Sequence, residues 1–298
     1  MHDSILTYAK SRYLWIAFAL VIGSLIAYFW HDPGGPPNGG TWLGYTLGTI
    51  SALLVVWLML FGVRKRSYMG NIGTLRGWLS AHIYLGTTLI LLVLLHSGFQ
   101  VHWSIHTFTF VLMLIVIFSG FFGLFAYLRY PSMMTRNRDS ATRDAMLDEV
   151  AEIDQNALGL ADGIDPKIHA LVLRSIENTR LGGGVWTQLR ARDGSDIALR
   201  SLHEAMEKRE AHKEMRTTEM PTMFAMVDFL AGRATDKQGE AMRKLIDLIS
   251  RKKALATKVA RDIQFQALME IWLYIHVPLS FALLAALIAH IISSFFYW

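Results

Sequence analysis

The run LSAHIYLGTTLILLVLLHSGF, residues 79–99, decides how the chain is interpreted. It is apolar and long enough to cross a hydrocarbon core of ~30 Å as a helix. It also carries His82 and His96, which are fourteen residues apart. At a rise of ~1.5 Å per residue, the two imidazoles are expected about 21 Å apart along the helix axis. Fourteen residues make two heptads, so in a left-handed bundle both side chains lie on one face.

The last apolar run, EIWLYIHVPLSFALLAALIAHIISSFF at residues 270–296, repeats this arrangement with His276 and His290. Two helices with histidines at matched depths can hold two flat cofactors, one near each membrane face. Imidazole is a ligand of haem iron, so we predict that these four histidines bind the iron of two haems b. Cysteine is absent, which excludes disulfides, thiolate-bound clusters and covalent haem attachment through CxxCH.

Composition places the chain among integral membrane proteins. Of its 298 residues 53% are hydrophobic and 18% charged, and the mean hydropathy is +0.32. The pattern predicts an all-α bundle with five spans, at about residues 13–30, 42–63, 79–99, 107–128 and 267–298. Lys and Arg at the membrane edges account for the net charge of +5, so we expect contact with lipid and no nucleic-acid partner.

The loops alternate in charge and predict the orientation. Basic residues mark the N-terminus, the second-to-third loop and the segment after the fourth run, whereas the other two loops lack them. The positive-inside rule therefore predicts a multi-pass protein of the cell inner membrane, with the N-terminus cytoplasmic and the C-terminus external. The third and fifth spans are then parallel. This pairs His82 with His276 on the cytoplasmic side and His96 with His290 on the external side.

Residues 131–266 differ from the rest of the chain. They hold 22 of the 29 Lys and Arg and 21 of the 24 Asp and Glu, and their apolar residues recur at helical spacing. We predict a cytoplasmic helical insert whose last helix continues into the fifth span. The chain then divides into residues 1–130, 131–266 and 267–298, and the insert is the surface on which other redox subunits would dock.

Other residues allow two interpretations each. Gly48 and Gly62, fourteen apart in the second span, would clear a macrocycle edge or simply aid helix packing. Arg76 is the best candidate to bind a haem propionate, ahead of Arg64 and Lys65, although flanking charge explains all three. His102 and His106 fit propionate binding, proton transfer at a quinone site, a surface metal or ordinary interfacial histidines. Glu270 fits quinone protonation or pairing with a basic flank.

The pattern resembles the dihaem b-type membrane cytochromes. His82, His96, His276, His290, Gly48 and Gly62 resemble the cytochrome b subunits of quinol-oxidising complexes; the placement on the third and fifth spans also resembles ferric-reductase-like transmembrane proteins. The resemblance covers about residues 42–128 and 268–298 and implies that the four histidines ligate two haems b. The helical insert departs from both groups. A flavin or NAD domain is missing, which argues against a self-contained NADPH-driven ferric reductase.

The expected function is electron transfer across the bilayer between quinone and a redox partner protein, as the cytochrome b subunit of a membrane oxidoreductase complex. Two alternatives remain open. Intramembrane histidines also serve as proton relays, so a haem-free proton or ion transporter would show the same residues. A signalling or assembly protein would use the insert as its working part.

Overall fold

The computed structural model describes residues 5–32, 34–66, 73–100, 103–138, 141–218 and 225–296, without the side chains of 212–218 and 225–236. The described residues form helices and loops, with one isolated pair of bridged residues in place of a sheet. The predicted all-α fold is therefore confirmed. The chain separates into two compact units, here called the apolar unit (Met1–Phe125 with Trp272–Trp298) and the charged unit (Ala126–Ile271).

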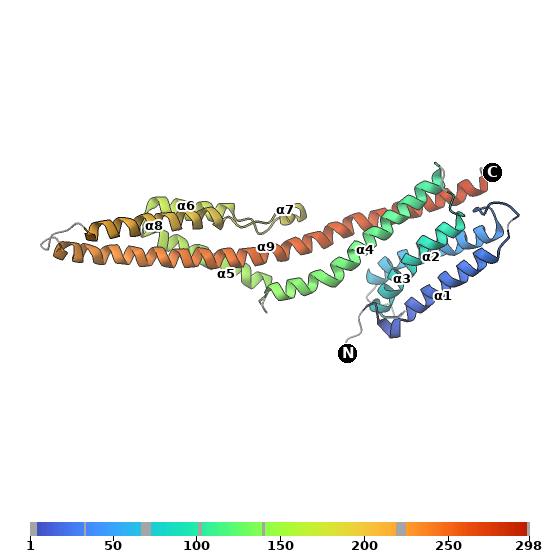
Figure 1. Ribbon diagram of the computed structural model, residues 1–298, viewed down its shortest axis with the longest axis horizontal. Coiled ribbons are helices and arrows are strands. Elements are labelled where there is room, and N and C mark those ends of the chain that lie inside the picture. Colours follow the sequence, from blue (N-terminus) through green and yellow to red (C-terminus); the bar gives the residue numbers. More distant parts are fainter. Residues whose placement is uncertain are drawn as a thin grey trace. The chain divides into compact units, whose positions relative to one another are not determined.

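The apolar unit is built from helices that are long and apolar enough to cross a membrane. Among the described residues there are five such helices, which confirms the predicted number. They are α1 (Tyr8–Trp30), α2 (Trp42–Arg66), α3 (Leu75–His96), the first part of α4 (Ile105–Arg138) and the last part of α9 (Ala225–Phe296) (Figure 1).

Loop contacts show which ends of these helices lie together. The hydroxyl of Thr74, before α3, donates to the Tyr8 hydroxyl at the start of α1 (2.8 Å). Gln100, after α3, donates to the carbonyl of Pro37 between α1 and α2 (3.0 Å). The α1–α2 and α3–α4 loops therefore share one end of the unit, and the N-terminal residues share the other end with the α2–α3 loop.

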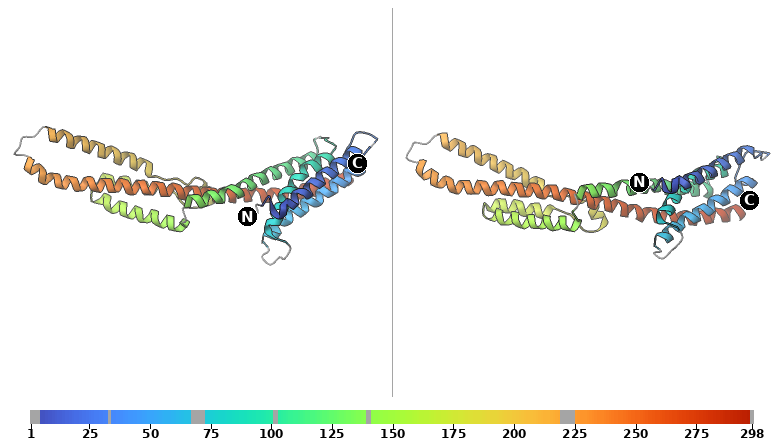
Figure 2. Two further views of the ribbon diagram at one scale, coloured as in Figure 1. Left: turned by 60° about the horizontal axis from the view of Figure 1, so that its bottom comes forward. Right: turned by 90° about the horizontal axis from the view of Figure 1, so that it is seen from below.

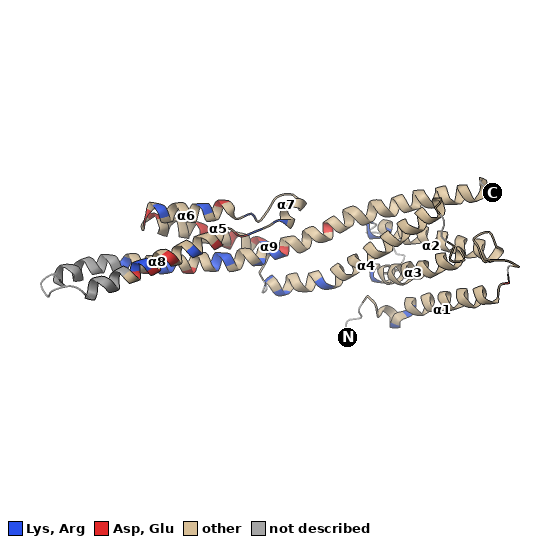
Figure 3. Ribbon diagram, turned by 45° about the horizontal axis from the view of Figure 1, so that its top comes forward, with Lys and Arg blue, Asp and Glu red and all other residues tan. Residues whose placement is uncertain are grey.

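The charged unit packs α5 (Arg143–Asp162), α6 (Pro166–Asn178) and α8 (Ser195–Thr218) with α9, and the short helix α7 (Val185–Leu189) lies between α6 and α8 in the chain. As expected for capped helices, the side chain of Thr142 accepts from Ala145 N, and that of Asp165 accepts from Lys167 N. Helix α9 is continuous through both units, as the sequence predicts (Figure 2). Acidic and basic residues gather on α5, α6, the described part of α8 and residues 237–262 of α9 (Figure 3).

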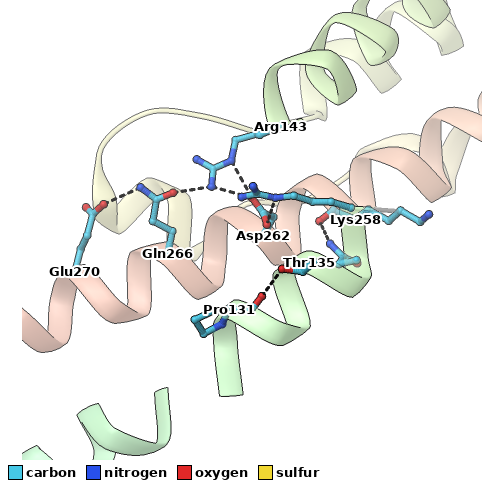
Figure 4. Close-up of polar contacts among 9 residues, drawn as sticks. Pro131, Thr135, Arg143, Lys258, Asp262, Gln266 and Glu270 are labelled. Atoms are coloured by element: carbon cyan, nitrogen blue, oxygen red, sulfur yellow. Dashed lines mark hydrogen bonds and ion pairs between the residues drawn. The ribbon is translucent and has the colours of Figure 1, made fainter. Parts of the chain in front are cut away.

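Buried charges in this unit are neutralised inside the protein. Asp262 is fully buried and accepts hydrogen bonds from the guanidinium groups of Arg138 and Arg143 (2.7–2.9 Å) (Figure 4). The bond to Asp262 raises the pKa of Arg138. Lys252, also fully buried, lies 2.7 Å from Asp154. Burial raises the pKa of Asp154, although Lys252 opposes the effect. These pairs tie the end of α4 and helix α5 to α9.

Candidate functional site

The histidines of the His96/His290 pair lie next to each other although 194 positions separate them in sequence. His96 ends α3 and His290 lies near the end of α9. Their ring centroids are 6.1 Å apart and the ring planes are inclined by 68°. Metal–imidazole bonds of about 2 Å place two rings on opposite faces of one metal ion at centroid distances of about 6 Å. The observed distance therefore fits ligation of one iron by both rings.

His82 and His276 lie on the same two helices, fourteen residues before His96 and His290. Among the described residues, no ring contact like that of His96 and His290 is found between them. The ring centroids of His82 and Phe61 are 5.2 Å apart, and so are those of His276 and Trp272. A Cβ at Gly120 would lie 3.7 Å from Cε1 of His276, so that face of the ring approaches the backbone of α4.

All four histidines hydrogen-bond through Nδ1 within the part of the chain that the structure describes. The partners are the Gly44 carbonyl for His96 (2.7 Å), the Leu58 carbonyl for His82 (3.2 Å), the Ser119 hydroxyl for His276 (2.7 Å) and Nδ1 of His106 for His290 (2.7 Å). A histidine held in this way through Nδ1 is oriented to ligate a metal through Nε2.

The partners also fix the tautomer of three rings. A carbonyl oxygen only accepts, so His82 and His96 carry their proton on Nδ1. The Ser119 hydroxyl donates its proton to the Val116 carbonyl (2.8 Å), so it accepts from Nδ1 of His276. These assignments follow from the hydrogen-bond network. Each of the three rings therefore has its Nε2 lone pair available to a metal.

A packed apolar layer separates the two pairs. Val55, Leu89 and Leu283 belong to one buried cluster. Leu89 lies seven residues from both His82 and His96, and Leu283 lies seven from both His276 and His290. Seven residues correspond to about 10 Å of helix, so the layer is at mid-depth between the pairs. The arrangement gives two separate sites rather than one cluster of four histidines.

The glycines have different surroundings. A Cβ at Gly48 would lie 2.7 Å from Cε1 of His96, so the missing side chain makes room for the imidazole. At Gly62 a Cβ would meet nothing within 4 Å. At Gly123 a Cβ would overlap the indole of Trp272, 2.0 Å from Cζ2. The indole N–H of Trp272 donates to the Ser119 carbonyl (2.7 Å).

His106 adds a third imidazole to the His96/His290 pair. Its ring lies 4.5 Å from that of His290, nearly perpendicular to it. The sequence places His106 at this edge, but its contact with His290 joins residues 184 positions apart and has no local signal. His102, considered together with it, lies outside the described residues.

The other candidates named from the sequence have the following surroundings. Arg76 is exposed in the first turn of α3. Arg64 donates to the Gly73 carbonyl (3.0 Å). Glu270 accepts from Gln266, which itself accepts from Arg143, so this carboxylate is linked to the basic side of the charged unit (Figure 4).

No family model, curated protein or solved structure matches this chain. Among the described residues there is also no group of three or more His, Cys, Asp or Glu side chains arranged to hold a metal ion. A haem with two axial histidines does not need such a group, because the macrocycle supplies the other four ligands. The haem assignment therefore depends on the ring geometry of His96 and His290 and on the hydrogen bonds of all four histidines.

Proposed function

We propose that this chain is a membrane electron-transfer protein that holds one haem b between His96 and His290 and another between His82 and His276. The observation that carries the proposal is that all four histidines hydrogen-bond through Nδ1, and that for His82, His96 and His276 the partner holds the proton there, which leaves Nε2 for iron. The centroid distance of 6.1 Å in the His96/His290 pair supports it independently.

Bound haem, held by His82 with His276 and by His96 with His290, would supply one-electron chemistry, and ligation by two histidines would favour electron transfer over oxygen binding. The chain's own residues bind and orient. The Gly44 and Leu58 carbonyls and the Ser119 hydroxyl hold three rings in one tautomer and one rotation. The hydrogen bond from each Nδ1–H makes its ring a better donor to the metal.

The apolar layer gives the two haems separate surroundings. Val55, Leu89 and Leu283 exclude water between the pairs, and the polar partners of each pair lie at its own level. Burial and hydrogen bonding set the potential of such centres, so the two haems should differ in potential. That difference would give electron flow between them a direction.

Orientation is part of the proposal. Lys10, Arg12 and the basic end of α2 belong to the end of the apolar unit that holds Thr74 and Tyr8. The positive-inside rule makes this end cytoplasmic in the inner membrane, and the charged unit, entered after the basic end of α4, then also lies in the cytoplasm. We propose that a redox partner docks on the charged unit and exchanges electrons with the His82/His276 haem. Quinone would exchange electrons near His96 and His290.

A haem-free proton transporter is the second candidate, and one observation favours it. His96, His290 and His106 form a row of imidazoles with centroid distances of 6.1 and 4.5 Å, a geometry that suits proton transfer. In such a protein the same residues would work without iron.

Reduction by quinol separates the two candidates. Protein purified from cells supplied with haem precursor is expected to show a low-spin b-type spectrum. In membranes from the same cells, a soluble quinol is expected to reduce the haem. Removing His290 should abolish quinol-driven reduction, whereas dithionite still reduces the haem of the other pair. Protein that lacks haem but carries protons in liposomes would overturn the proposal in favour of the transporter.

A further inference from the structure

The loop between α6 and α8 gathers arginines around a hollow in the charged unit. Arg180 and Arg192 face each other in an antiparallel bridge, with N–O distances of 2.9 and 3.1 Å. Directly opposite residues of such a bridge carry their side chains on one side. Together with Arg190, Trp186 and Thr187 they line a cavity of about 420 Å³.

Other arginines of the unit are neutralised by carboxylates. Arg138, Arg143, Arg243 and Arg251 each pair with a carboxylate. No acidic partner within the described residues is found for the three arginines of the hollow. Asp193, next to Arg192 in sequence, accepts from the Ser195 hydroxyl (2.7 Å). Like charges opposite each other in a bridge repel and are destabilising. A bound anion would relieve this repulsion.

The loop is also held in place without a ligand. Ala191 is buried, and its carbonyl accepts from the side chain of Gln264 in α9 (3.0 Å). The Gln188 side chain donates to the Gly183 carbonyl (2.9 Å), and Gly194 N donates to the Thr179 hydroxyl (3.2 Å). The three guanidinium groups are thus presented by an anchored backbone, which lowers the entropy lost when they bind together.

We propose that this hollow binds a phosphate group. Guanidinium groups bind phosphate oxygens bidentately, and three of them suit a doubly charged phosphate better than a single carboxylate. The Thr187 hydroxyl offers a further hydrogen bond. Trp186, 71% exposed, offers an aromatic surface for the remainder of the ligand. The phosphate has two sources with the same chemistry, an anionic lipid headgroup and a soluble phosphate ester. Tryptophan favours the membrane interface, so the exposed Trp186 suits the lipid source.

The test uses the full chain in phosphatidylcholine nanodiscs, with pyrophosphate as the soluble probe in a calorimetric titration. Saturable binding is expected if the source is soluble, and Arg190→Gln with Arg192→Gln should weaken it at least about tenfold. The control is Arg174→Gln, an exposed arginine of α6 outside the hollow, which should bind as the unmodified chain does.

The lipid source is tested by fluorescence quenching with brominated lipids, using Trp186→Phe to subtract the other tryptophans. Quenching of Trp186 by brominated phosphatidylglycerol but not by brominated phosphatidylcholine is expected, and the double arginine variant should lose it. The proposal is overturned if neither pyrophosphate binding nor headgroup-selective quenching is seen. It is also overturned if Arg174→Gln reduces either signal as much as the double variant does.

Discussion

The two units satisfy their buried polar groups in opposite ways. In the charged unit, Asp262 accepts four hydrogen bonds from Arg138 and Arg143. In the apolar unit, four half-buried histidines hydrogen-bond at Nδ1, and their described contacts leave Nε2 without a partner. A carboxylate whose oxygens are all hydrogen-bonded, such as Asp262, holds helices together. A histidine that is hydrogen-bonded only at Nδ1 can still bind a ligand at Nε2. The contrast is the basis for proposing a ligand at the histidines and none at Asp262.

The largest effect is expected from removing one histidine of a pair. His290→Ala should eliminate the haem at His96 and leave the haem of the His82/His276 pair, because the Leu89 and Leu283 layer keeps the sites apart. His276→Ala should do the reverse. Haem per chain, measured by absorption against protein mass, should fall by half in each variant.

The matched control is His203→Ala, an exposed histidine of the charged unit whose ring bonds the Leu199 carbonyl. It should retain full haem content. Equal haem in all three variants would show that the paired histidines do not bind iron.

Asp262→Ala should damage the charged unit without affecting haem. Removing the acceptor leaves the charges of Arg138 and Arg143 side by side, which costs about 3–5 kcal/mol for a buried pair. Denaturant unfolding followed by circular dichroism should show this loss, and Asp247→Ala, an exposed aspartate of α9, should show little. If haem content falls together with stability, the two units are not independent in the way the contrast implies.

Gly48→Ala and Gly62→Ala form a matched pair fourteen residues apart on α2. A methyl group at Gly48 would strike the His96 ring, whereas at Gly62 it meets open space. Displacing the oriented ring should weaken haem binding at His96/His290 by about 10–100-fold, as for other changes around a metal ligand. Haem titration of both variants checks this. An equal loss on Gly62→Ala would show instead that haem fills the space beside Gly62.

Ser119→Ala should have the smallest effect. It removes the acceptor of the His276 Nδ1–H bond but leaves the ligand, at a cost of about 0.5–1.5 kcal/mol, or a few-fold in haem affinity. The potential of the His82/His276 haem should also shift, and a redox titration would resolve it from the other haem. A shift confined to the His96/His290 haem would contradict the pairing.

The sequence was sufficient to predict the helices and the residues that share one helix face, because both follow from regular spacing. Length and apolarity identify five helices, and a spacing of two heptads places His82 with His96, and His276 with His290, on one helix face. The contacts between helices could not be predicted from the sequence. The spans are apolar all round, so no pattern says how each is rotated about its axis. The Gly44 and Leu58 carbonyls, Ser119, and the approach of Trp272 to Gly123 therefore appear only in the structure.

In the charged unit, amphipathic spacing predicts the helices. It also predicts that the last of them continues into the fifth span, as α9 does. It does not predict that Arg180 and Arg192 face each other, because that bridge depends on how a glycine-rich loop folds back on itself. It also does not distinguish Asp262 from the exposed acids around it, since burial of this carboxylate follows from the packing of α4 and α5 on α9.

A pyridine haemochrome assay with independent protein quantification tests the central claim most directly. The full chain, purified from membranes of cells supplied with haem precursor, should contain two haems b per polypeptide. Both should be extractable into acidified organic solvent, since the absence of cysteine rules out a thioether link. A preparation that is folded, as judged by its helical circular dichroism, but contains no haem would contradict the account.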